Sequence, residues 1–219
     1  PVGTLIEKCL LARETIENIG DPLESEYAKW NQGACNQFDI NSERQKIEDQ
    51  LKPGDFVIIQ FGHNDQKIKS PDRYTNPFTE YRYNLEKYVK ETREKGATPI
   101  LMSSIVRRNF NEHGTLVDTH GEYPLVVRMV AKDLGVAFID MQWLTQQLEV
   151  KYGPEDSATL HLHFQPGEVA YYPDGKDDNT HLSEKGAILV ASLALQEIAK
   201  KELDLKYFIK PSTLQKEIL

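Results

Sequence analysis

The residues best suited to chemistry lie in Asp178-Asn179-Thr180-His181, which places a carboxylate three residues before an imidazole. We expect this stretch to form the turn into the last long helix, where the two side chains can face each other. Serine hydrolases use such a pair, because the carboxylate fixes the imidazole tautomer and stabilises the imidazolium formed when the ring takes a proton. Taken alone, the spacing also fits an Asp that closes a turn beside an exposed His.

A second polar cluster, Gly62-His63-Asn64-Asp65, directly follows an apolar run over 55–62. A side-chain amide such as that of Asn64 can donate to a developing oxyanion, and removing such a donor typically costs about 10²–10³ in turnover. The alternative is an ordinary turn after a strand, where Asn and Asp are common. Together with Asp178 and His181, the cluster favours an acyl-transfer site.

Apolar runs and helical patterns alternate along the chain. Strands are expected over 55–62, 99–106 and 136–140, and helices over 4–18, from 42 to about 52, 77–95, 123–134, 142–152 and 183–203. The strands are nearly continuous apolar runs, which suit parallel strands covered on both faces. This order predicts an α/β fold with a parallel sheet between helices, and ligands bind beyond the carboxyl ends of such strands.

Local signals define several boundaries. Asn76-Pro77 offers an N-cap with proline at the first helical position, and Ser183 offers an N-cap for the last helix. The helix over 77–95 is expected to bury the stripe Phe78, Tyr81, Leu85, Tyr88 and Val89. The last helix is expected to bury Ile188, Leu189, Ala191, Leu195 and Ile198. Residues 154–181 are expected to form a short helix and then a long loop.

Composition narrows the class of protein. The 219 residues are 39% hydrophobic and 27% charged, which fits one globular domain. A net charge of −8 argues against a nucleic-acid partner. No apolar run approaches the roughly 18 residues of a membrane span, and no secretory signal is expected in this chain, as in a mature exported protein. Cys9 and Cys35 are expected to be thiols, with one disulfide as the alternative.

Gly62-His63-Asn64-Asp65 resembles the G-x-N-D block of the SGNH (GDSL-type) hydrolases, and Asp178-Asn179-Thr180-His181 resembles their D-x-x-H block. The similarity is strongest to the rhamnogalacturonan acetylesterase branch, over roughly residues 42–200. It runs in order through LKPGDFVIIQFGHNDQK, YTNPFTEYRYNL, SSIVRRNFNEHGTLVDTHGEYP, LHLHFQPGE and DDNTHLSEKGA. A match of this length and order is far more specific than either short block.

The resemblance implies a three-layer αβα, flavodoxin-like fold and a serine esterase that removes acetyl groups from pectic polysaccharide. It implies no metal or other cofactor and a periplasmic or secreted location. His181 would be the general base and Asp178 its orienting carboxylate. Asn64 would be one oxyanion donor, and Gly33 is the best counterpart of the second.

The family nucleophile belongs to a G-D-S block on the first strand, and this chain departs from that pattern. Gly20-Asp21-Pro22 has proline in the serine position. Ser25 lies in an acidic polar stretch, and the resemblance gives Ser103 and Ser104 no such role. We therefore assign no nucleophile.

Three explanations stay open for the missing block. Residues 1–41 are expected to be a truncated or diverged segment before a hydrolase-like domain over 42–203 and a tail over 204–219, all within one domain overall. The sheet would then lack its first strand or strands. A diverged segment would leave a catalytically inactive carbohydrate-binding relic, and in the third explanation another chain supplies the serine.

Several polar residues near the predicted strand ends are candidates for sugar binding, each with a structural role as the alternative: His63, Asp65, Arg107, Arg108, His120 and Tyr123. Because the chain is acidic, recognition of pectic carboxylates must be local, and Arg107 or Arg108 is the candidate. His161 and His163 alternate, but without a third ligand nearby they predict an extended segment rather than a metal site. A nucleotide-binding domain would require a glycine-rich loop after a strand, which the sequence lacks.

Overall fold

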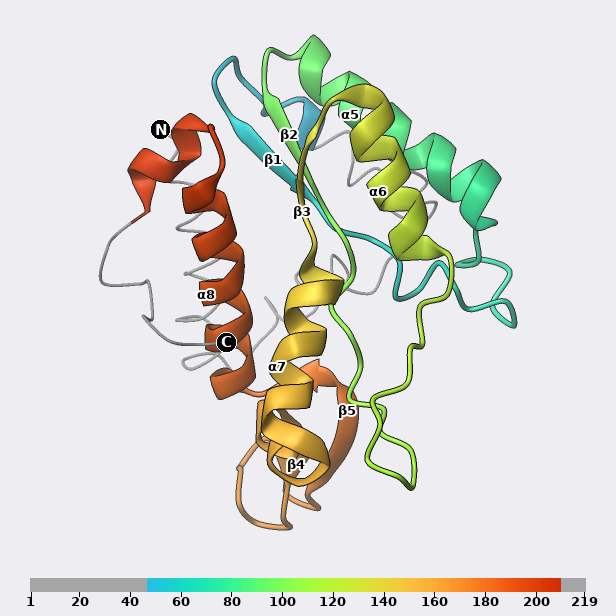
Figure 1. The fold of residues 1–219 in the computed structure, drawn as a ribbon, viewed down its shortest axis with the longest axis vertical. Coiled ribbons are helices and arrows are strands. Elements are labelled where there is room, and N and C mark those ends of the chain that lie inside the picture. The colour runs from blue at the N-terminus through green and yellow to red at the C-terminus, as the bar shows by residue number, and fades with distance from the viewer. Residues whose placement is uncertain (1–46, 210–219) are drawn as a thin grey trace. The chain divides into compact units, whose positions relative to one another are not determined.

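A computed structural model describes residues 47–209 of the chain (Figure 1). The chain divides into two compact units. The first, here called the sheet unit, contains residues 47–104 and Glu122–Phe138; the second, the hairpin unit, contains Ile105–Gly121 and residues 139–209. The expectations for residues 1–41, including Gly33, Cys9 and Cys35, lie outside the described residues.

The sheet unit is built on three strands in the order β1-β2-β3. Strand β1 (Phe56–Ile59) runs parallel to β2 (Thr98–Met102), with Ile58 opposite Ile100. Strand β3 (Ala137–Ile139) lies beside β2. All three predicted strands are present, although each is shorter than its apolar run.

Helices follow the strands in the predicted order. A π-helical turn, η1 (Pro77–Tyr81), continues into α5 (Arg82–Glu94), and α6 (Tyr123–Leu134) leads to β3. Helices α5 and α6 lie side by side against the sheet (Figure 1). The α/β fold with a parallel sheet flanked by helices is thereby confirmed.

The start of η1 follows from its sequence. Asn76 Oδ1 accepts from the N–H of Phe78 at 3.1 Å, and Pro77 occupies the first position, as predicted. Phe78, however, is 51% exposed and not in the core. The N–H of Tyr81 donates to Asn76 O at 3.0 Å, which makes η1 a wider π-helical turn. The buried face predicted from a period of 3.6 residues therefore does not extend back to Phe78.

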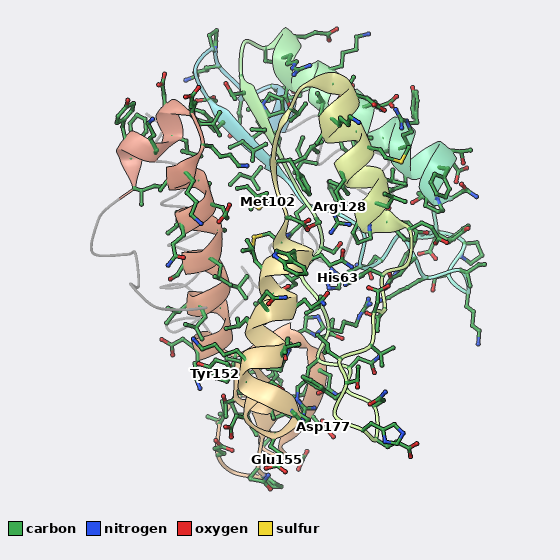
Figure 2. All side chains as sticks on the ribbon, in the orientation of Figure 1. His63, Met102, Arg128, Tyr152, Glu155 and Asp177 are labelled. Atoms are coloured by element: carbon green, nitrogen blue, oxygen red, sulfur yellow. The ribbon has the colours of Figure 1, made fainter. Side chains whose placement is uncertain are left out.

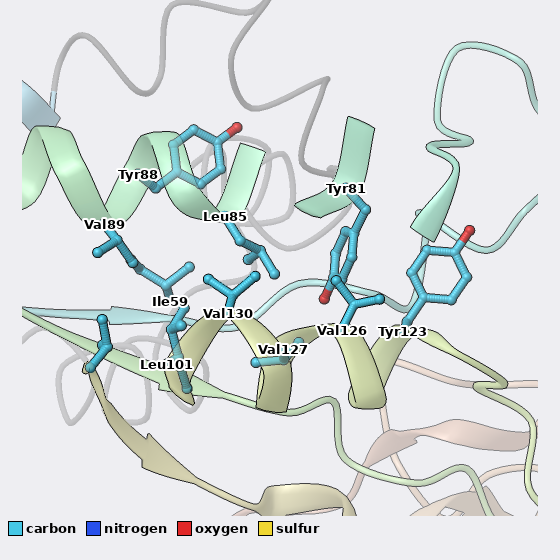
Figure 3. Packing of buried hydrophobic residues seen from close by; sticks show 12 residues of the cluster. Ile59, Tyr81, Leu85, Tyr88, Val89, Leu101, Tyr123, Val126, Val127 and Val130 are labelled. Carbon is cyan, nitrogen blue, oxygen red and sulfur yellow. The ribbon is translucent and has the colours of Figure 1, made fainter. Parts of the chain in front are cut away.

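The core of the sheet unit lies between α5, α6 and the strands (Figure 3). Tyr81 and Tyr123 meet edge to face, with ring centroids 5.0 Å apart. The buried apolar residues around them are Ile59, Leu85, Tyr88, Val89, Leu101, Val126, Val127, Val130, Ala131 and Val136. This core fixes the ends of β1 and β2, where the predicted polar loops begin.

The hairpin unit contains an antiparallel strand pair between helices. Its elements are α7 (Met141–Asp156), η2 (Ser157–Leu160), β4 (His161–Phe164), β5 (Lys176–Leu182), α8 (Glu184–Lys200) and η3 (Asp204–Phe208). The predicted loop over 154–181 is therefore wrong where β4 and β5 pair. Strand β5 reads KDDNTHL and has almost no apolar residues, so hydrophobic periodicity could not reveal it.

Helix α8 starts where predicted, because Ser183 Oγ accepts from the N–H of Gly186 at 3.1 Å. Its buried face differs from the expected one. Ile198 is buried, but Ala191 is exposed and Leu193 takes its place in a cluster with Leu148 and Leu160. The remaining predicted core residues, Ile188, Leu189 and Leu195, are half-buried.

Gly186 allows the first turn of α8 to approach the segment before β4. A Cβ at this position would lie 2.0 Å from the carbonyl oxygen of Leu160. No side chain fits at that separation, so glycine is required by close backbone contact. Figure 2 shows the side chains of this unit, including Tyr152 and Glu155 on α7 and Asp177 on β5.

Candidate active site

The Asp178–His181 stretch lies in a bulge of β5. Leu162 of β4 pairs with Asp178, and the preceding His161 pairs with Leu182, so residues 179–181 are extra on the β5 side. Such extra residues bend a strand and redirect its side chains. The stretch is therefore not the turn predicted before α8 but an interruption of a strand pair.

The bulge brings the two side chains together as predicted. His181 Nδ1 lies 2.8 Å from Asp178 Oδ2, while the N–H groups of Thr180 and His181 donate to Asp178 Oδ1 at 2.8 and 3.0 Å. Burial alone would raise the pKa of Asp178, but these backbone and side-chain hydrogen bonds outweigh it and lower the pKa to about 2.

The ionised Asp178 carboxylate can only accept, so Nδ1 of His181 carries the proton and donates to it. The basic nitrogen of the ring is then Nε2. The His181 side chain is 72% exposed, which leaves Nε2 accessible to a reacting group. This arrangement can take a proton from a nucleophile and stabilise the resulting imidazolium.

A second set of hydrogen bonds holds the middle of the bulge. The backbone N–H of Arg108 donates to Asn179 O at 2.9 Å, and its Nη1 donates to Asn179 Oδ1 at 2.8 Å. Arg108 Nε donates to Ser157 Oγ at 3.1 Å, and Nη2 donates to Pro154 O. His163 Nε2 lies 2.8 Å from the same Asn179 Oδ1. The Arg108 guanidinium is thus engaged within the hairpin unit, and its expected sugar contact stays a prediction.

In the sheet unit, a buried carboxylate organises the loop after β1. Asp65 is 0% exposed; its Oδ2 accepts from the N–H of Gly62 at 3.1 Å and its Oδ1 from Thr75 Oγ1 at 2.9 Å. The N–H of Lys67 donates to Asn64 O at 3.1 Å. Asn64, the predicted oxyanion donor, thus lies in a turn that the hydrogen bonds of the buried Asp65 hold in place.

Tyr123 completes this network from α6. Its hydroxyl lies 2.9 Å from Asp65 O and 2.7 Å from Thr75 O. Burial raises the pKa of Tyr123, so the hydroxyl stays protonated as a donor. Sugar contacts were predicted for Asp65 and Tyr123, but the burial of both gives that prediction no support. His63, labelled in Figure 2, is half-buried, and its sugar contact stays a prediction.

The carboxyl ends of β1 and β2 meet, as expected for neighbouring parallel strands. Ser104 Oγ donates to Phe61 O at 2.9 Å, and Gln60 Nε2 donates to Ser103 O at 2.9 Å. Gly62 has a φ of 135°, and a Cβ there would lie 2.4 Å from Ser104 Oγ. Ser103 and Ser104 are fully buried, so a substrate cannot reach either hydroxyl in this structure.

The loop of residues 105–121 uses its polar residues internally. His120 is buried and donates from Nε2 to Ile105 O at 2.8 Å. Burial lowers the pKa of His120, and the nearby charge of Arg107 lowers it further, so the neutral ring is favoured. Arg107 Nη1 donates to Thr119 Oγ1 at 3.1 Å. His120 is not exposed to a sugar, and the role of Arg107 stays a prediction.

His161 and His163 lie on a strand, as expected, and have different partners. His161 Nε2 is 2.8 Å from Glu149 Oε1 in the interior, whereas His163 Nδ1 is 3.1 Å from Asp177 Oδ1. Over residues 47–209, no group of three or more His, Cys, Asp or Glu side chains is arranged to hold a metal ion. No helix in the same range has the length and apolar character needed to cross a membrane.

Residues 19–188 match the sequence model of the GDSL-like Lipase/Acylhydrolase family. The chain belongs to this family. It is 43% identical over 173 residues to Rhamnogalacturonan acetylesterase RhgT of Bacillus subtilis (strain 168), which covers 79% of this chain and 73% of the relative. It is 32% identical over 161 residues to Probable rhamnogalacturonan acetylesterase YesY of the same organism, covering 74% and 69%. The resemblance found in the sequence is confirmed, and the chain is by homology an acylhydrolase.

Among solved structures, the fold is similar to that of protein YxiM from Bacillus subtilis, with a TM-score of 0.65 and 22% identity. The match covers 79% of this chain and 44% of the YxiM chain. At this identity the likeness concerns the fold alone. It agrees with the parallel sheet and flanking helices described above.

Proposed function

We propose that this GDSL-like family member is a serine esterase that removes O-acetyl groups from a pectic polysaccharide of the rhamnogalacturonan type. The observation that carries the proposal is the 2.8 Å contact between His181 Nδ1 and Asp178 Oδ2. Its substrate class is supported by the 43% identity to a protein named as a rhamnogalacturonan acetylesterase.

In the proposed reaction, a serine hydroxyl attacks the acetyl carbonyl while His181 Nε2 accepts its proton. Asp178 stabilises the imidazolium and takes no proton itself. Asn64 and Gly33 are proposed as donors to the oxyanion, following the family resemblance. Collapse of the tetrahedral intermediate expels the sugar hydroxyl, which takes the proton from His181. Water, deprotonated by His181, then releases acetate and restores the serine.

The mechanism is tested with p-nitrophenyl acetate and acetylated rhamnogalacturonan. Replacing His181 by Ala is expected to lower turnover of both by at least about 10³-fold, because general base catalysis is lost. The matched control is His113→Ala, an exposed histidine in the 105–121 loop, which should stay within about twofold of wild type. A serine-directed phosphonate followed by peptide mass spectrometry would identify the nucleophile.

Two outcomes would contradict the proposal. Equal turnover in wild type and His181→Ala would exclude this histidine as the base. Absence of turnover and of phosphonate labelling, with polysaccharide binding retained, would instead support a carbohydrate-binding protein without esterase activity. This second function is considered because Gly20-Asp21-Pro22 has proline where the family motif has its nucleophilic serine.

A further inference from the structure

The sheet unit contains a cavity of about 500 Å³ beside the loop that follows Asp65. This volume is within the range of small-molecule sites, roughly 300–1,000 Å³. The cavity is formed by a continuous part of the chain, from Pro71 to Asn84, that spans the end of the loop, η1 and the first turn of α5. The catalytic steps proposed above use none of its residues.

The wall of the cavity combines aromatic rings with uncharged polar groups. Tyr74 and Tyr83 contribute rings, and Tyr83 is 65% exposed. Thr79 contributes a hydroxyl, and Asn84, a residue that is only 8% exposed, contributes an amide. A sugar ring presents C–H groups on its faces and hydroxyls at its rim, so rings and polar groups in one cavity match both surfaces.

The charges of the residues that line the cavity indicate which class of sugar ring it can bind. Glu80 is the acidic residue of the lining, and its Oε2 accepts from the N–H of Asn76 at 3.3 Å. Among the described residues that line the cavity, none is basic. A carboxylate in the wall repels an acidic sugar and accepts hydrogen bonds from neutral hydroxyls. The lining therefore favours a neutral ring over a uronic acid.

Hydrogen bonds connect the cavity to the predicted oxyanion loop. Thr75, in the wall, donates from Oγ1 to Asp65 Oδ1 at 2.9 Å and from its N–H to Asp65 O at 3.1 Å. Asp65 follows Asn64 directly. A ring bound in the cavity would thus lie against the same hydrogen-bonded segment that carries Asn64.

We propose that this cavity is a subsite for a neutral sugar ring of the polysaccharide main chain. This inference rests on the proposed function and deepens it. In a polysaccharide of the rhamnogalacturonan type, the cavity takes a neutral rhamnosyl ring rather than a galacturonosyl one.

The test compares Tyr83→Ala with wild type on a large and a small substrate. The KM for acetylated rhamnogalacturonan is expected to rise about three- to tenfold, because one aromatic contact with the ring is lost. Turnover of p-nitrophenyl acetate, which is too small to need the subsite, is expected to stay unchanged. Tyr83→Phe should restore the KM, and Tyr207→Ala, which changes another exposed tyrosine, in η3, is the matched control.

Binding is also measured without catalysis, by affinity electrophoresis in gels that contain deacetylated rhamnogalacturonan or homogalacturonan. Wild type should be retarded by the first polymer more than by the second, and Tyr83→Ala should lose this retardation. Equal retardation of wild type and Tyr83→Ala would overturn the subsite, and equal retardation by both polymers would overturn its preference for a neutral ring. If retardation depends on Tyr83 while wild type has no esterase activity, the proposed function fails and the subsite stands.

Discussion

Arg108 Nη1 lies 2.8 Å from Asn179 Oδ1, and the backbone N–H of Arg108 donates to the carbonyl of the same asparagine at 2.9 Å. Asn179 sits between Asp178 and His181, so Arg108 holds the bulge at two points. Arg108 also donates hydrogen bonds to Ser157 and Pro154, so it connects the bulge to the segment at the end of α7. The arginine is therefore suited to position Asp178 and His181, the proposed catalytic pair.

Replacing Arg108 by Ala should lower kcat for p-nitrophenyl acetate by about 10- to 100-fold, because small misplacements of a catalytic group are costly. Lys at this position should restore little, since a single ammonium cannot reproduce the fork of a guanidinium. The control is Arg107→Ala, the neighbouring arginine, which donates to Thr119 and should change kcat by less than about threefold. Equal losses in the two variants would show that Arg108 has no special relation to the bulge.

The carboxylate of the pair can be tested by Asp178→Asn. The amide cannot hold the Nδ1–H tautomer of His181, so kcat should fall by about 10⁴-fold, as in other triads. A large fall with an unchanged KM for p-nitrophenyl acetate would identify a loss confined to the transition state. A fall of less than tenfold would mean that Asp178 does not orient the base.

The same carboxylate makes a pH-dependent contribution to stability. Its pKa is lowered from 3.8 to about 2 in the folded chain, so the stabilisation is complete above 3.8 and is lost as the pH falls toward 2. Measured from about pH 5 downward, the difference in free energy of unfolding between wild type and Asp178→Asn should shrink below about pH 4. Urea unfolding at several pH values measures it. A difference that grows toward acid would reverse the sign and contradict the assigned hydrogen bonds.

Local sequence signals predicted much of this structure because their causes are local. Asn76, Ser183 and the span of α6 were found from capping and periodicity, which act within one helix. The bulge of β5 was missed because KDDNTHL carries no hydrophobic period. The hydrogen bond from Arg108 to Asn179 joins residues that are 71 positions apart, so no local sequence pattern predicts it. The Asp178–His181 contact could be predicted from its spacing, whereas the groups that support it required the tertiary structure.

Gly186→Ala tests the close approach of α8 to the segment before β4. Alanine favours helices by about 1 kcal/mol over glycine, but here its Cβ would lie 2.0 Å from Leu160 O. The clash should dominate, so the melting temperature is expected to fall rather than rise. Ala187→Val, at the adjacent exposed position, is the control and should change stability only slightly. A stabilised Gly186→Ala variant would show that α8 can move away from Leu160 without a loss of stability.

The buried pair of Glu149 and His161 joins α7 to β4 at 2.8 Å. Glu149 Oε2 and His161 Nδ1 are buried and have no hydrogen-bond partner among residues 47–209, so within that range the pair is only partly satisfied. Replacing either residue by Leu should cost about 3–5 kcal/mol, because the remaining polar group is left buried and unpaired. Replacing both should cost clearly less than the sum of the single changes.

The comparison is made by a double-mutant cycle in urea, with the exposed Lys90–Glu94 pair of α5 as the control. That pair is solvent-exposed and should show no measurable coupling, because water screens both charges. Additive effects at Glu149 and His161 would mean that the two side chains do not depend on each other. A strong coupling there, absent at Lys90–Glu94, would show that burial makes the two side chains of α7 and β4 interdependent.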